Sequence, residues 1–581
     1  MSDPYTNFYM IMLPVAGLFA LLTLLYVLRA AFNKQGGEIG GWELRGAGRR
    51  IAAIARTTLS EGMRAKAGAG FAVIILVAIP IFWFTATGDG TIKGQVQMFL
   101  SYSLGFTGFL LSLLTIFFSC RSLSNEISSR QIYGIVSKPV PRWQIVAGKW
   151  TGVMALNVIL LSIATLATYI GTQATIRRFK GQLAHELATY GALKPDQAEA
   201  TVAALDDVKG VGKEGIESPI VTAFMKALGK PREELGEILT RLPEATRVNL
   251  RKFDEMRRQV VVARAAVGVE LPDVTSEVEK RFAKLKEAGE LPQGWSDSKI
   301  RKQIEISLYG QYSTVPYGPQ NSRQWRIAGP KPVKGRDVIM SIRFKLNAPG
   351  YVPPYNENGA TLEENTLVCA WGIGDPSKPS FVQTLEPYPI NSFYELEIPS
   401  SCAEDDGTVI LSFVNLDPRK HDVSFDFQNH GLEVLYHVGS FESGLIQASL
   451  ATLVPIACLA SFGVFASTFL SFPVGTLIVL TLYLLASSLG FIADALAVTK
   501  DYTGPYSLGL EFEIRRASYD FIGWTLAIGD LDPVNKLIEG RAVGWLPLWN
   551  DWWKFVMLKG LIVFVLAVMV IRRRELAAVI V

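Results

Sequence analysis

Seven apolar runs constrain this chain more than any other feature of its 581 residues. A helix needs roughly 20 apolar residues to cross the hydrocarbon core of a bilayer. Mean hydropathy is +0.25, although 19% of residues are charged. These values fit an uneven chain, partly in lipid and partly in water. The candidate spans are about Phe8–Leu28, Ala67–Thr87, Met98–Cys120, Trp150–Ile170, Leu445–Phe469, Pro473–Leu496 and Phe555–Ile571.

The first of these runs is expected to be a membrane span rather than a cleaved signal peptide. Further spans follow it, and Asp3 precedes it instead of a basic cluster. The spans hold few ionisable residues, since Asp494 and Lys559 lie near the ends of theirs. Ion-coupled carriers keep charged groups at mid-membrane. The pattern therefore argues against a transporter driven by an ion gradient and favours an outside source of energy.

Lysine and arginine are concentrated in three segments next to the spans. Residues 31–68 carry seven basic residues against three acidic ones, and residues 121–149 carry five against one. Residues 572–574 are three arginines. Basic residues accumulate in the short cytoplasmic loops of membrane proteins. With seven spans, all three segments fall on one side, which we expect to be the cytoplasm. The N-terminus and the insert 172–444 then lie outside.

A basic amphipathic segment, Arg49–Lys66, precedes the second span. At helical spacing its apolar residues fall on one half of the helix and its charged residues on the other. Such a helix is expected to lie in the interface plane, with its arginines among the lipid headgroups. A simple juxtamembrane anchor is the plainer interpretation, and the two are compatible. The apolar half holds Ile51, Ile54, Ala55, Leu59 and Met63, and the charged half holds Arg49, Arg50, Arg56, Glu61 and Arg64.

The loop 121–149 carries more signals than a plain connection between two spans needs. Ser124 can cap a helix start, and Glu126 suits the first turn of that helix. The Lys138–Pro139 pair ends it, because the residue before proline avoids helical geometry. Pro141 stands where a new helix can begin. The pattern predicts a short transverse helix, a proline break and re-entry into the membrane. The alternative is an ordinary positively charged loop.

The stretch NEISSRQIYGIVSKPVPRWQIVAGKW in this loop resembles the corresponding loop of ABC transporter permeases of type 2. IARTTLSEGMRAK is similar to that family's elbow helix. GDLDPVNKLIEGRAVGW, followed by a span and RRREL, is similar to its outer re-entrant segment and C-terminus. The resemblance covers about residues 49–171 and 445–575. The chain departs from it at Ser129–Arg130–Gln131, where the family often has Gly-Thr, and by its N-terminal span and very large insert.

This resemblance implies a permease subunit in the inner membrane of a bacterial cell. It would pair with a second permease subunit, identical or different, and a separate cytoplasmic ABC ATPase would carry ATP and Mg. The short transverse helix would be the element that couples the two proteins. By the same resemblance, the residues that contact the ATPase are Glu126, Arg130, Tyr133, Lys138 and Arg142, and the elbow helix presents Arg50, Arg56 and Arg64.

The sequence holds no motif for nucleotide binding or hydrolytic chemistry. The stretch Gly210–Val211–Gly212–Lys213 lacks the earlier glycine and the following Ser or Thr of a P-loop. HExxH and GxSxG are absent as well. We therefore expect no enzyme activity, bound cofactor or metal in this chain. The net charge of +4 is small for this length and gives no sign of nucleic-acid binding.

The insert changes its periodicity along the chain. Residues 172–310 show spaced apolar residues with charges between them, which predicts helices. From about Gln324 the period becomes two, as in DVIMSIRFKL, which predicts an antiparallel β-sandwich. The expected regions are 1–48, an extra span and linker; 49–171, the elbow helix, three spans and the loop 121–149; 172–323, an outer helical region; 324–442, the sandwich; and 443–581, three spans with an outer re-entrant segment at 501–550.

The insert also holds two cysteines and three histidines that could form sites. Cys369 and Cys402 could form a disulfide in an oxidising compartment, although their spacing fixes no geometry. His421, His430 and His437 match no common metal-ligand spacing. Ordinary surface histidines are the simpler interpretation of these three residues.

These features predict a polytopic α-helical membrane protein of about seven spans with an extracytoplasmic helical and β-sandwich insert. The leading function is the permease subunit of an ATP-driven exporter. One alternative is a mechanotransmission or envelope-assembly protein, whose outer domain moves while no solute crosses the membrane. The size of the insert, about half of the chain, supports this alternative. Another is a membrane-anchored binding module, which leaves the coupling-like loop without a purpose. Neither the substrate nor the identity of the second permease follows from these residues.

Overall fold

The computed structural model describes most of the chain. The first predicted span lies outside the described residues, as do Tyr133 and Lys138 of the loop. The described residues are 42–64, 66–88, 90–131, 140–191, 193–207, 227–228, 241–291, 297–329, 339–348, 366–427, 431–488 and 532–573.

The chain divides into two compact units. One holds the apolar helices, and we call it the membrane unit. The other lies between them in sequence, and we call it the insert unit. The membrane unit is Pro4–Phe179, Glu255–Val261 and Ser440–Val581, and the insert unit is Met1–Asp3, Lys180–Asp254 and Val262–Gly439.

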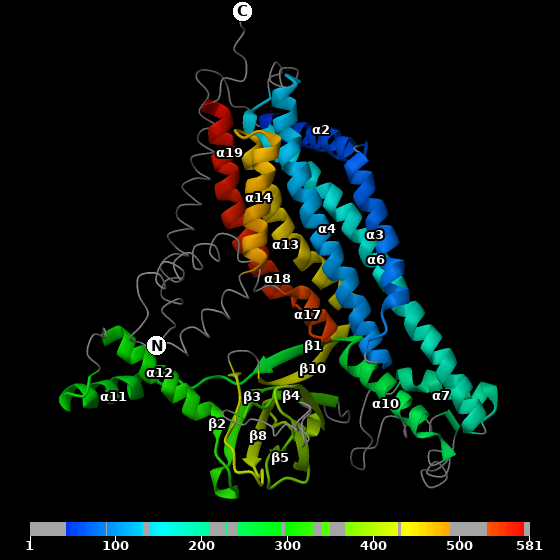
Figure 1. Cartoon of the computed structure of the whole chain (residues 1–581), viewed down its shortest axis with the longest axis vertical. Helices are drawn as coiled ribbons and strands as arrows, with labels where there is room; N and C mark the ends of the chain where they lie inside the picture. The colour runs from blue at the N-terminus through cyan, green and yellow to red at the C-terminus, as the bar shows by residue number, and fades with distance from the viewer. Residues whose placement is uncertain are drawn as a thin grey trace, which may run out of the picture. The chain divides into compact units, whose positions relative to one another are not determined.

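Long apolar helices run side by side in the membrane unit (Figure 1). Within the described residues, four helices are long and apolar enough to cross a membrane, and a fifth span results if the bent pair α2–α3 counts as one. Helix α14, with 16 residues, is shorter. The helices are α2 (Trp42–Arg64), α3 (Lys66–Thr85), α4 (Ile92–Ser128), α6 (Arg142–Tyr190), α13 (Phe441–Ser467), α14 (Phe472–Ser487), α17 (Pro533–Ile538), α18 (Trp545–Asp551) and α19 (Leu561–Arg573), with a π-helical segment at Trp552–Gly560.

Helix α13 lies at the centre of this bundle. In its most apolar stretch 72% of the residues are buried, against 33% in the corresponding stretch of Trp545–Arg573. Small residues let two helices approach closely in lipid. A Cβ atom on Gly463 of α13 would lie 1.8 Å from the Ser119 Oγ atom of α4. The Trp150 indole of α6 donates a hydrogen bond to the Ala457 carbonyl of α13 at 3.2 Å. Both α4 and α6 are therefore packed onto α13.

Contacts between helix ends define two ends of the bundle. At one end Lys149, near the start of α6, contacts Glu126, near the end of α4. At the other end Gln97, near the start of α4, donates a hydrogen bond to the Ile538 carbonyl of α17 at 3.1 Å. Helix α4 has 37 residues, or about 55 Å at the usual rise, so these ends are a bilayer's thickness apart. We call them the basic end and the α17 end, because the first carries Arg121, Arg130, Arg142, Arg572 and Arg573.

The prediction of a transverse helix beginning at Ser124 is wrong. Helix α4 continues through Ser124 and Glu126, which lie in its last two turns. The helix continues beyond the apolar run because its later residues still pack against neighbouring helices. Leu123 is buried in a hydrophobic cluster that includes residues of α6 and α19, and Lys149 neutralises the Glu126 carboxylate. The membrane helix and the expected coupling element are thus one continuous rod up to Ser128.

The insert unit combines helices with antiparallel strands. Helices α11 and α12 pack as a pair, since Arg301 of α12 stacks on the Phe282 ring at 3.9 Å and pairs with Glu279 of α11 at 2.9 Å. Helix α10 begins in this unit and ends in the membrane unit. The helices are α7 (Pro195–Asp207), α10 (Glu244–Gln259), α11 (Thr275–Glu287) and α12 (Asp297–Ser313).

The strands form two four-stranded sheets, of order β1-β10-β4-β7 and β3-β8-β5-β6, and a two-stranded sheet, β2-β9. Strand β1 lies inside the region predicted to be helical, which is a correction. Its sequence, VARAAVG, has no β-type alternation, and it is an edge strand held by its pairing with β10. The strands are β1 (Val262–Gly268), β2 (Thr314–Val315), β3 (Arg323–Ala328), β4 (Ile339–Lys345), β5 (Thr366–Ile373), β6 (Val382–Pro389), β7 (Phe393–Pro399), β8 (Thr408–Asn415), β9 (Val423–Ser424) and β10 (Leu432–Ser440).

The two larger sheets contribute to one hydrophobic core. Met340, Ile342 and Phe344 of β4 are buried, as the period-two pattern predicts. The Phe344 and Trp371 rings lie 4.8 Å apart, and Trp371 lies 4.8 Å from Phe413 of β8. Such aromatic contacts add to the free energy gained by burying the rings. An antiparallel β-sheet-rich insert in a membrane protein is therefore confirmed.

The β1-β10-β4-β7 sheet also carries a row of paired charges. Arg343 of β4 pairs with Glu433 of β10 at 3.1 Å, and Arg264 of β1 pairs with Glu395 of β7 at 2.7 Å. The register aligns Arg343 with both acidic residues. Arg343 also stacks on the Phe393 ring at 3.8 Å. Breaking a buried pair leaves an uncompensated charge, so this row disfavours any slipped register of the four strands.

Cys369 and Cys402 do not form the disulfide that the sequence allowed. Both are buried free thiols, and the Cys402 thiol donates a hydrogen bond to the Ser380 carbonyl at 3.0 Å. Each packs as a small apolar side chain in the core shared by the sheets. Burial, and to a lesser extent the Asp417 carboxylate, raises the pKa of the Cys369 thiol to about 12, so it stays protonated at neutral pH.

Candidate functional site

A buried lysine joins three helices at the basic end. Lys149 of α6 is 1% exposed, and its Nζ atom lies 2.5 Å from Oε1 of Glu126 on α4. The same Nζ lies 3.8 Å from Oε2 of Glu61 on α2. A lysine is almost never fully buried without a partner. The ionic group formed by Lys149, Glu126 and Glu61, which we call the Lys149 junction, therefore holds α2, α4 and α6 together.

One carboxylate of the junction is buried, and the other is exposed to solvent. Glu126 is 7% exposed, and its Oε2 atom is buried without a hydrogen-bond partner, whereas the Glu61 side chain is 53% exposed. Desolvating an ion pair costs free energy, and removing one partner costs more, because the other charge stays buried. Glu126 was expected to contact an ATPase directly. Its burial makes it an internal partner of Lys149 instead.

Two glycines next to Lys149 bring the backbones of α2 and α6 into contact. A Cβ atom on Gly148 would lie 2.6 Å from the Ile54 Cβ atom, and one on Gly152 would lie 2.9 Å from the Ala55 carbonyl oxygen. Residues four apart share one face of a helix, and glycines at this spacing allow close helix crossings in membranes. The amphipathic helix α2 is thus seated on α6 directly beside the ionic group.

Helix α2 has the amphipathic character that its sequence predicts. Arg56 and Arg64 are exposed, Arg50 is half-buried, and Thr58 on the opposite side is fully buried. The helix begins at Trp42, seven residues before the predicted start. The part Gly46–Arg64 is bent by 64° from the following helical part, Ala69–Thr85. A helix at this angle to the span after it is suited to an interfacial position.

Arg142 fixes the start of α6 to the end of α19. Its Nη1 atom donates hydrogen bonds to the carbonyls of Ile571 and Arg572, at 2.5 and 2.8 Å. The last carbonyls of a helix have no partner within the helix, and a cation there also interacts favourably with the helix dipole. Arg142 was expected to contact an ATPase. Its described contacts are within the chain, and α6 begins directly after Pro141, as predicted.

Among the described members of the predicted set, Arg130 is the exposed one. It follows the last residues of α4 with a φ of 60°, and its backbone N–H donates to the Ile127 carbonyl at 3.2 Å. A residue of this conformation commonly ends a helix. Its side chain is exposed at the first residues of the connection between α4 and α6. Tyr133 and Lys138 lie outside the described residues.

A pocket of about 450 Å³ opens beside the Lys149 junction. Glu61 and Arg64 of α2 and Arg121, Asn125 and Glu126 of α4 contribute to its lining. The pocket therefore offers charged groups of both signs, next to the place where α2 meets α4. Its lining also includes apolar side chains, among them Phe71, Phe117 and Phe118. No group of acidic, histidine or cysteine side chains in the described part of the chain is arranged to hold a metal.

Sequence reasoning missed the Lys149 junction, although part of its signal was visible. Gly148 and Gly152 stand four residues apart in GKWTG, which is the spacing of a close helix contact. The pairing of Lys149 with Glu126 had no such signal. The two residues are 23 positions apart, on either side of a loop.

A second set of contacts ties the α17 end together. Lys93 of α4 donates a hydrogen bond to the Gln259 side chain at the end of α10. Gly540, with a φ of 65°, lies so close to this segment that a Cβ atom would be 2.0 Å from the Gln259 carbonyl oxygen. The Gly544 N–H donates to the Gln447 side chain of α13 at 3.1 Å. Residues 255–261 are thus held against α4 and α17.

The fold and the Lys149 junction define a multi-pass membrane protein in which an interfacial helix is fastened to two adjoining long helices at one end. Comparison with protein families gives a more particular result. Residues 17–189 match the family model described as ABC-2 family transporter protein. The match holds α2, α3, α4 and all but the last residue of α6. The match supports the resemblance to ABC-2 type permeases for residues 49–171, and residues 445–575 lie outside the matched segment. No curated protein matches the chain.

Proposed function

We propose that this chain is the membrane-spanning permease subunit of an ATP-binding cassette exporter, driven by a separate ATPase that docks at the basic end. The observation that carries the proposal is the Lys149 junction. Lys149 joins α2, α4 and α6 at the two helix ends that the connection 129–141 links. A displacement of this connection or of α2 reaches both long helices, because neither can move without breaking a buried ion pair or a backbone contact.

The family match supports the wider arrangement. In this proposal the basic end faces the cytoplasm of a bacterial cell, following the distribution of basic residues, and the insert lies in the periplasm. The chain has seven spans, its two larger sheets form a β-sandwich, and it pairs with a second permease subunit. ATP and Mg belong to the ATPase. This chain supplies no catalytic residue, and Arg130 with the exposed residues of α2 provides the docking surface.

Affinity purification from native membranes tests the proposal. We expect a tagged chain to recover an ATPase that carries a Walker motif. Arg130→Glu should reduce that recovery, since it reverses the charge of an exposed side chain at the docking surface. Arg326→Glu, an exposed arginine of strand β3 in the insert unit, is the matched control and should leave the recovery unchanged. Export activity by the purified chain with no ATPase bound would contradict the proposal.

A specific observation favours mechanotransmission as a second candidate. Helix α6 runs without interruption from the membrane unit into the insert unit, over 49 residues. Strand β10 ends at Ser440, and α13 begins at the next residue. In this candidate function, these connections would carry motion of the membrane unit to the insert unit. Transport into sealed vesicles separates the candidates. Solute accumulation that depends on ATP supports export, and ATP hydrolysis that moves no solute supports mechanotransmission.

A further inference from the structure

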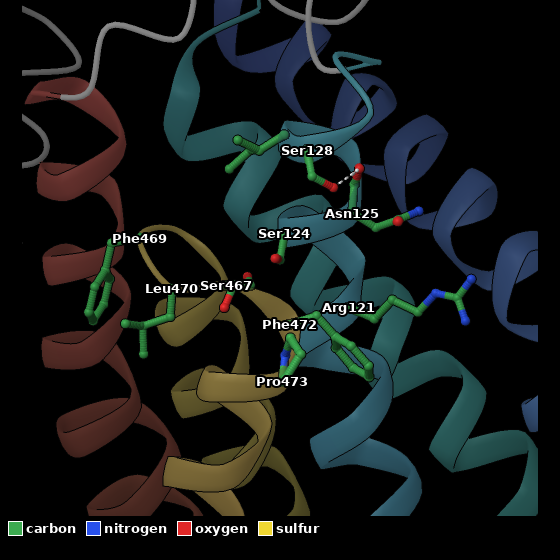
Figure 2. Close-up of a pocket in the computed structure, with 11 residues that line it drawn as sticks. Arg121, Ser124, Asn125, Ser128, Ser467, Phe469, Leu470, Phe472 and Pro473 are labelled. Atoms are coloured by element: carbon green, nitrogen blue, oxygen red, sulfur yellow. Dashed lines mark hydrogen bonds between the residues drawn. The ribbon is translucent and has the colours of Figure 1, made fainter.

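A second pocket at the basic end adjoins the first and shares Arg121, Asn125 and Phe472 with it. It measures about 490 Å³ and opens between the end of α4 and the turn that joins α13 to α14 (Figure 2). Its lining includes one arginine, one asparagine and four serines, and no carboxylate. A pocket with this lining offers hydrogen-bond donors and a positive charge, which suits an anion.

Ser124 is a buried hydroxyl that faces this pocket without a partner. The residue is 8% exposed, and its side chain makes no hydrogen bond within the described structure. Neighbouring serines behave differently, since Ser119, Ser122 and Ser128 each donate to a carbonyl three or four residues earlier in α4. Figure 2 shows the Ser124 hydroxyl directed into the space beside Ser467. The hydroxyl is open to the pocket, so a ligand there can accept its hydrogen bond.

The start of α14 supplies further donors at the same place. Ser471 precedes this 16-residue helix, but its side chain makes no capping hydrogen bond, so it leaves the N–H groups of Phe472 and Val474 uncapped. Pro473 has no N–H, and the Gly475 N–H donates to the Ser471 carbonyl at 2.9 Å. The N-terminal end of a helix binds anions through its free N–H groups and its dipole. Because Ser471 lines the pocket, these donors and the Ser124 hydroxyl can bind the same ligand.

The mouth of the pocket is both cationic and apolar. Arg121 is exposed and makes no ion pair within the described residues. Figure 2 shows Arg121 beside Phe472, with its guanidinium extending away from Ser124 and Ser467. Phe469, also in the lining, is 44% exposed. An amphiphile would find a cation for its headgroup and aromatic surface for its chains at this mouth.

We propose that this pocket binds the phosphate headgroup of an anionic phospholipid. The hydroxyls of Ser124 and Ser471 and the first-turn N–H groups of α14 donate to phosphate oxygens. Arg121 turns toward the headgroup and offsets its charge, while the acyl chains lie along Phe469 and Phe472. Juxtamembrane basic segments are attracted to anionic lipid surfaces, which favours a lipid over a soluble phosphate as the source. The lipid would bind whether or not an ATPase is docked.

Native mass spectrometry of the purified, delipidated chain tests the site. The chain is titrated with phosphatidylglycerol or with phosphatidylcholine, and bound lipid is counted. We expect one phosphatidylglycerol to bind more tightly than any phosphatidylcholine. Arg121→Gln and Ser124→Ala should each weaken it about tenfold, since hydrogen bonds to charged groups are worth on the order of 1.5–3 kcal/mol. The matched controls Arg573→Gln and Ser122→Ala should bind as the unchanged chain does.

The remaining outcomes decide against the proposal. Equal retention of the two lipids, or unchanged binding by both pocket variants, would overturn the site. Displacement of phosphatidylglycerol by inorganic phosphate would overturn the lipid assignment and make the ligand a soluble phosphate compound. Arg121 is exposed, so its variant is expected to fold, and a melting curve recorded without lipid checks that the loss of binding is not a loss of fold.

Discussion

The basic end and the α17 end of the membrane unit are held together by different chemistry. At the basic end, Lys149 is buried between two carboxylates and the backbones of α2 and α6 touch at Gly148. At the α17 end, the contacts are hydrogen bonds of Gln97 and Gln259 and the close approach of Gly540. The basic end depends on a buried ion pair. The α17 end depends on hydrogen bonds, one of them donated by the Lys93 ammonium, on backbone fit at Gly540, and on a pair of Arg541 with Glu539 at 3.5 Å.

This difference predicts which end of the membrane unit moves as one body when it is displaced and which end exchanges its contacts. A buried ion pair fixes which side chains meet, because any shift exposes one charge to an apolar surrounding. Amide hydrogen bonds cost less to break. We infer that the basic end moves as one body when it is pushed, while the contacts at the α17 end are exchanged more easily. The following substitutions test that inference, from the largest expected effect to the smallest.

The largest effect is expected for Lys149→Met. It leaves the Glu126 carboxylate buried without its cation, which should lower the free energy of unfolding by about 3–5 kcal/mol. The midpoint of thermal unfolding of the detergent-purified chain measures it. The double variant Lys149→Met/Glu126→Gln should recover much of the loss, because no buried charge remains. If the double variant is less stable than the single one, the junction is not held by charge compensation.

A smaller effect is expected for Gly540→Ala at the α17 end. An alanine at a φ of 65° is strained, and its Cβ would overlap the Gln259 carbonyl oxygen. We expect a loss of about 3 kcal/mol, and faster hydrogen exchange in residues 255–261. Gly105→Ala is the control, since a Cβ there meets no atom within 4 Å. Unchanged exchange in 255–261 would show that this segment is not held by Gly540.

Gly148→Ala should loosen α2 from α6 with a cost of about 2 kcal/mol. The new methyl group would lie 2.6 Å from the Ile54 Cβ atom, which shifts only with the backbone of α2, whereas at Gly540 the Gln259 carbonyl oxygen would be closer still, at 2.0 Å. A disulfide-trapping rate between cysteines placed on α2 and α6 reports the separation. Gly105→Ala again serves as the control. Equal trapping rates in both variants would mean that the glycine contact does not position α2.

The smallest effect is expected for Gln97→Ala, at about 1 kcal/mol. It removes one amide donor to the Ile538 carbonyl and leaves no charge behind. Thermal unfolding measured beside Lys149→Met gives the comparison directly. A loss as large as that of Lys149→Met would remove the distinction between the two ends.

The sequence predicts much of this architecture because its strongest signals are local. The apolar runs, the amphipathic α2 and the alternation in β4 each depend on residues close together in the chain. Within the described residues the structure confirms α2 and β4, and it has four or five helical spans where the apolar runs predict seven. The start of α6 after Pro141 follows from the same kind of local rule.

The rest could not be predicted because it depends on contacts between distant residues. Ser124 fits the pattern of a helix N-cap, but helix α4 continues through it because Glu126 forms an ion pair with Lys149 on the other side of the loop. Strand β1 has a weak sequence signal and exists through its pairing with β10. Cys369 and Cys402 are thiols because each is packed separately in the core. None of these partners can be identified from spacing alone.

Cross-linking in native membranes tests the central claim that the basic end receives the ATPase. Arg130→Cys and Lys536→Cys each place a thiol-linked photocross-linker at one end of the membrane unit, and the chain's own four cysteines are all buried. The account predicts that the Arg130 position captures an ATPase with a Walker motif and that the Lys536 position captures none. Capture from Lys536 with none from Arg130 would contradict it.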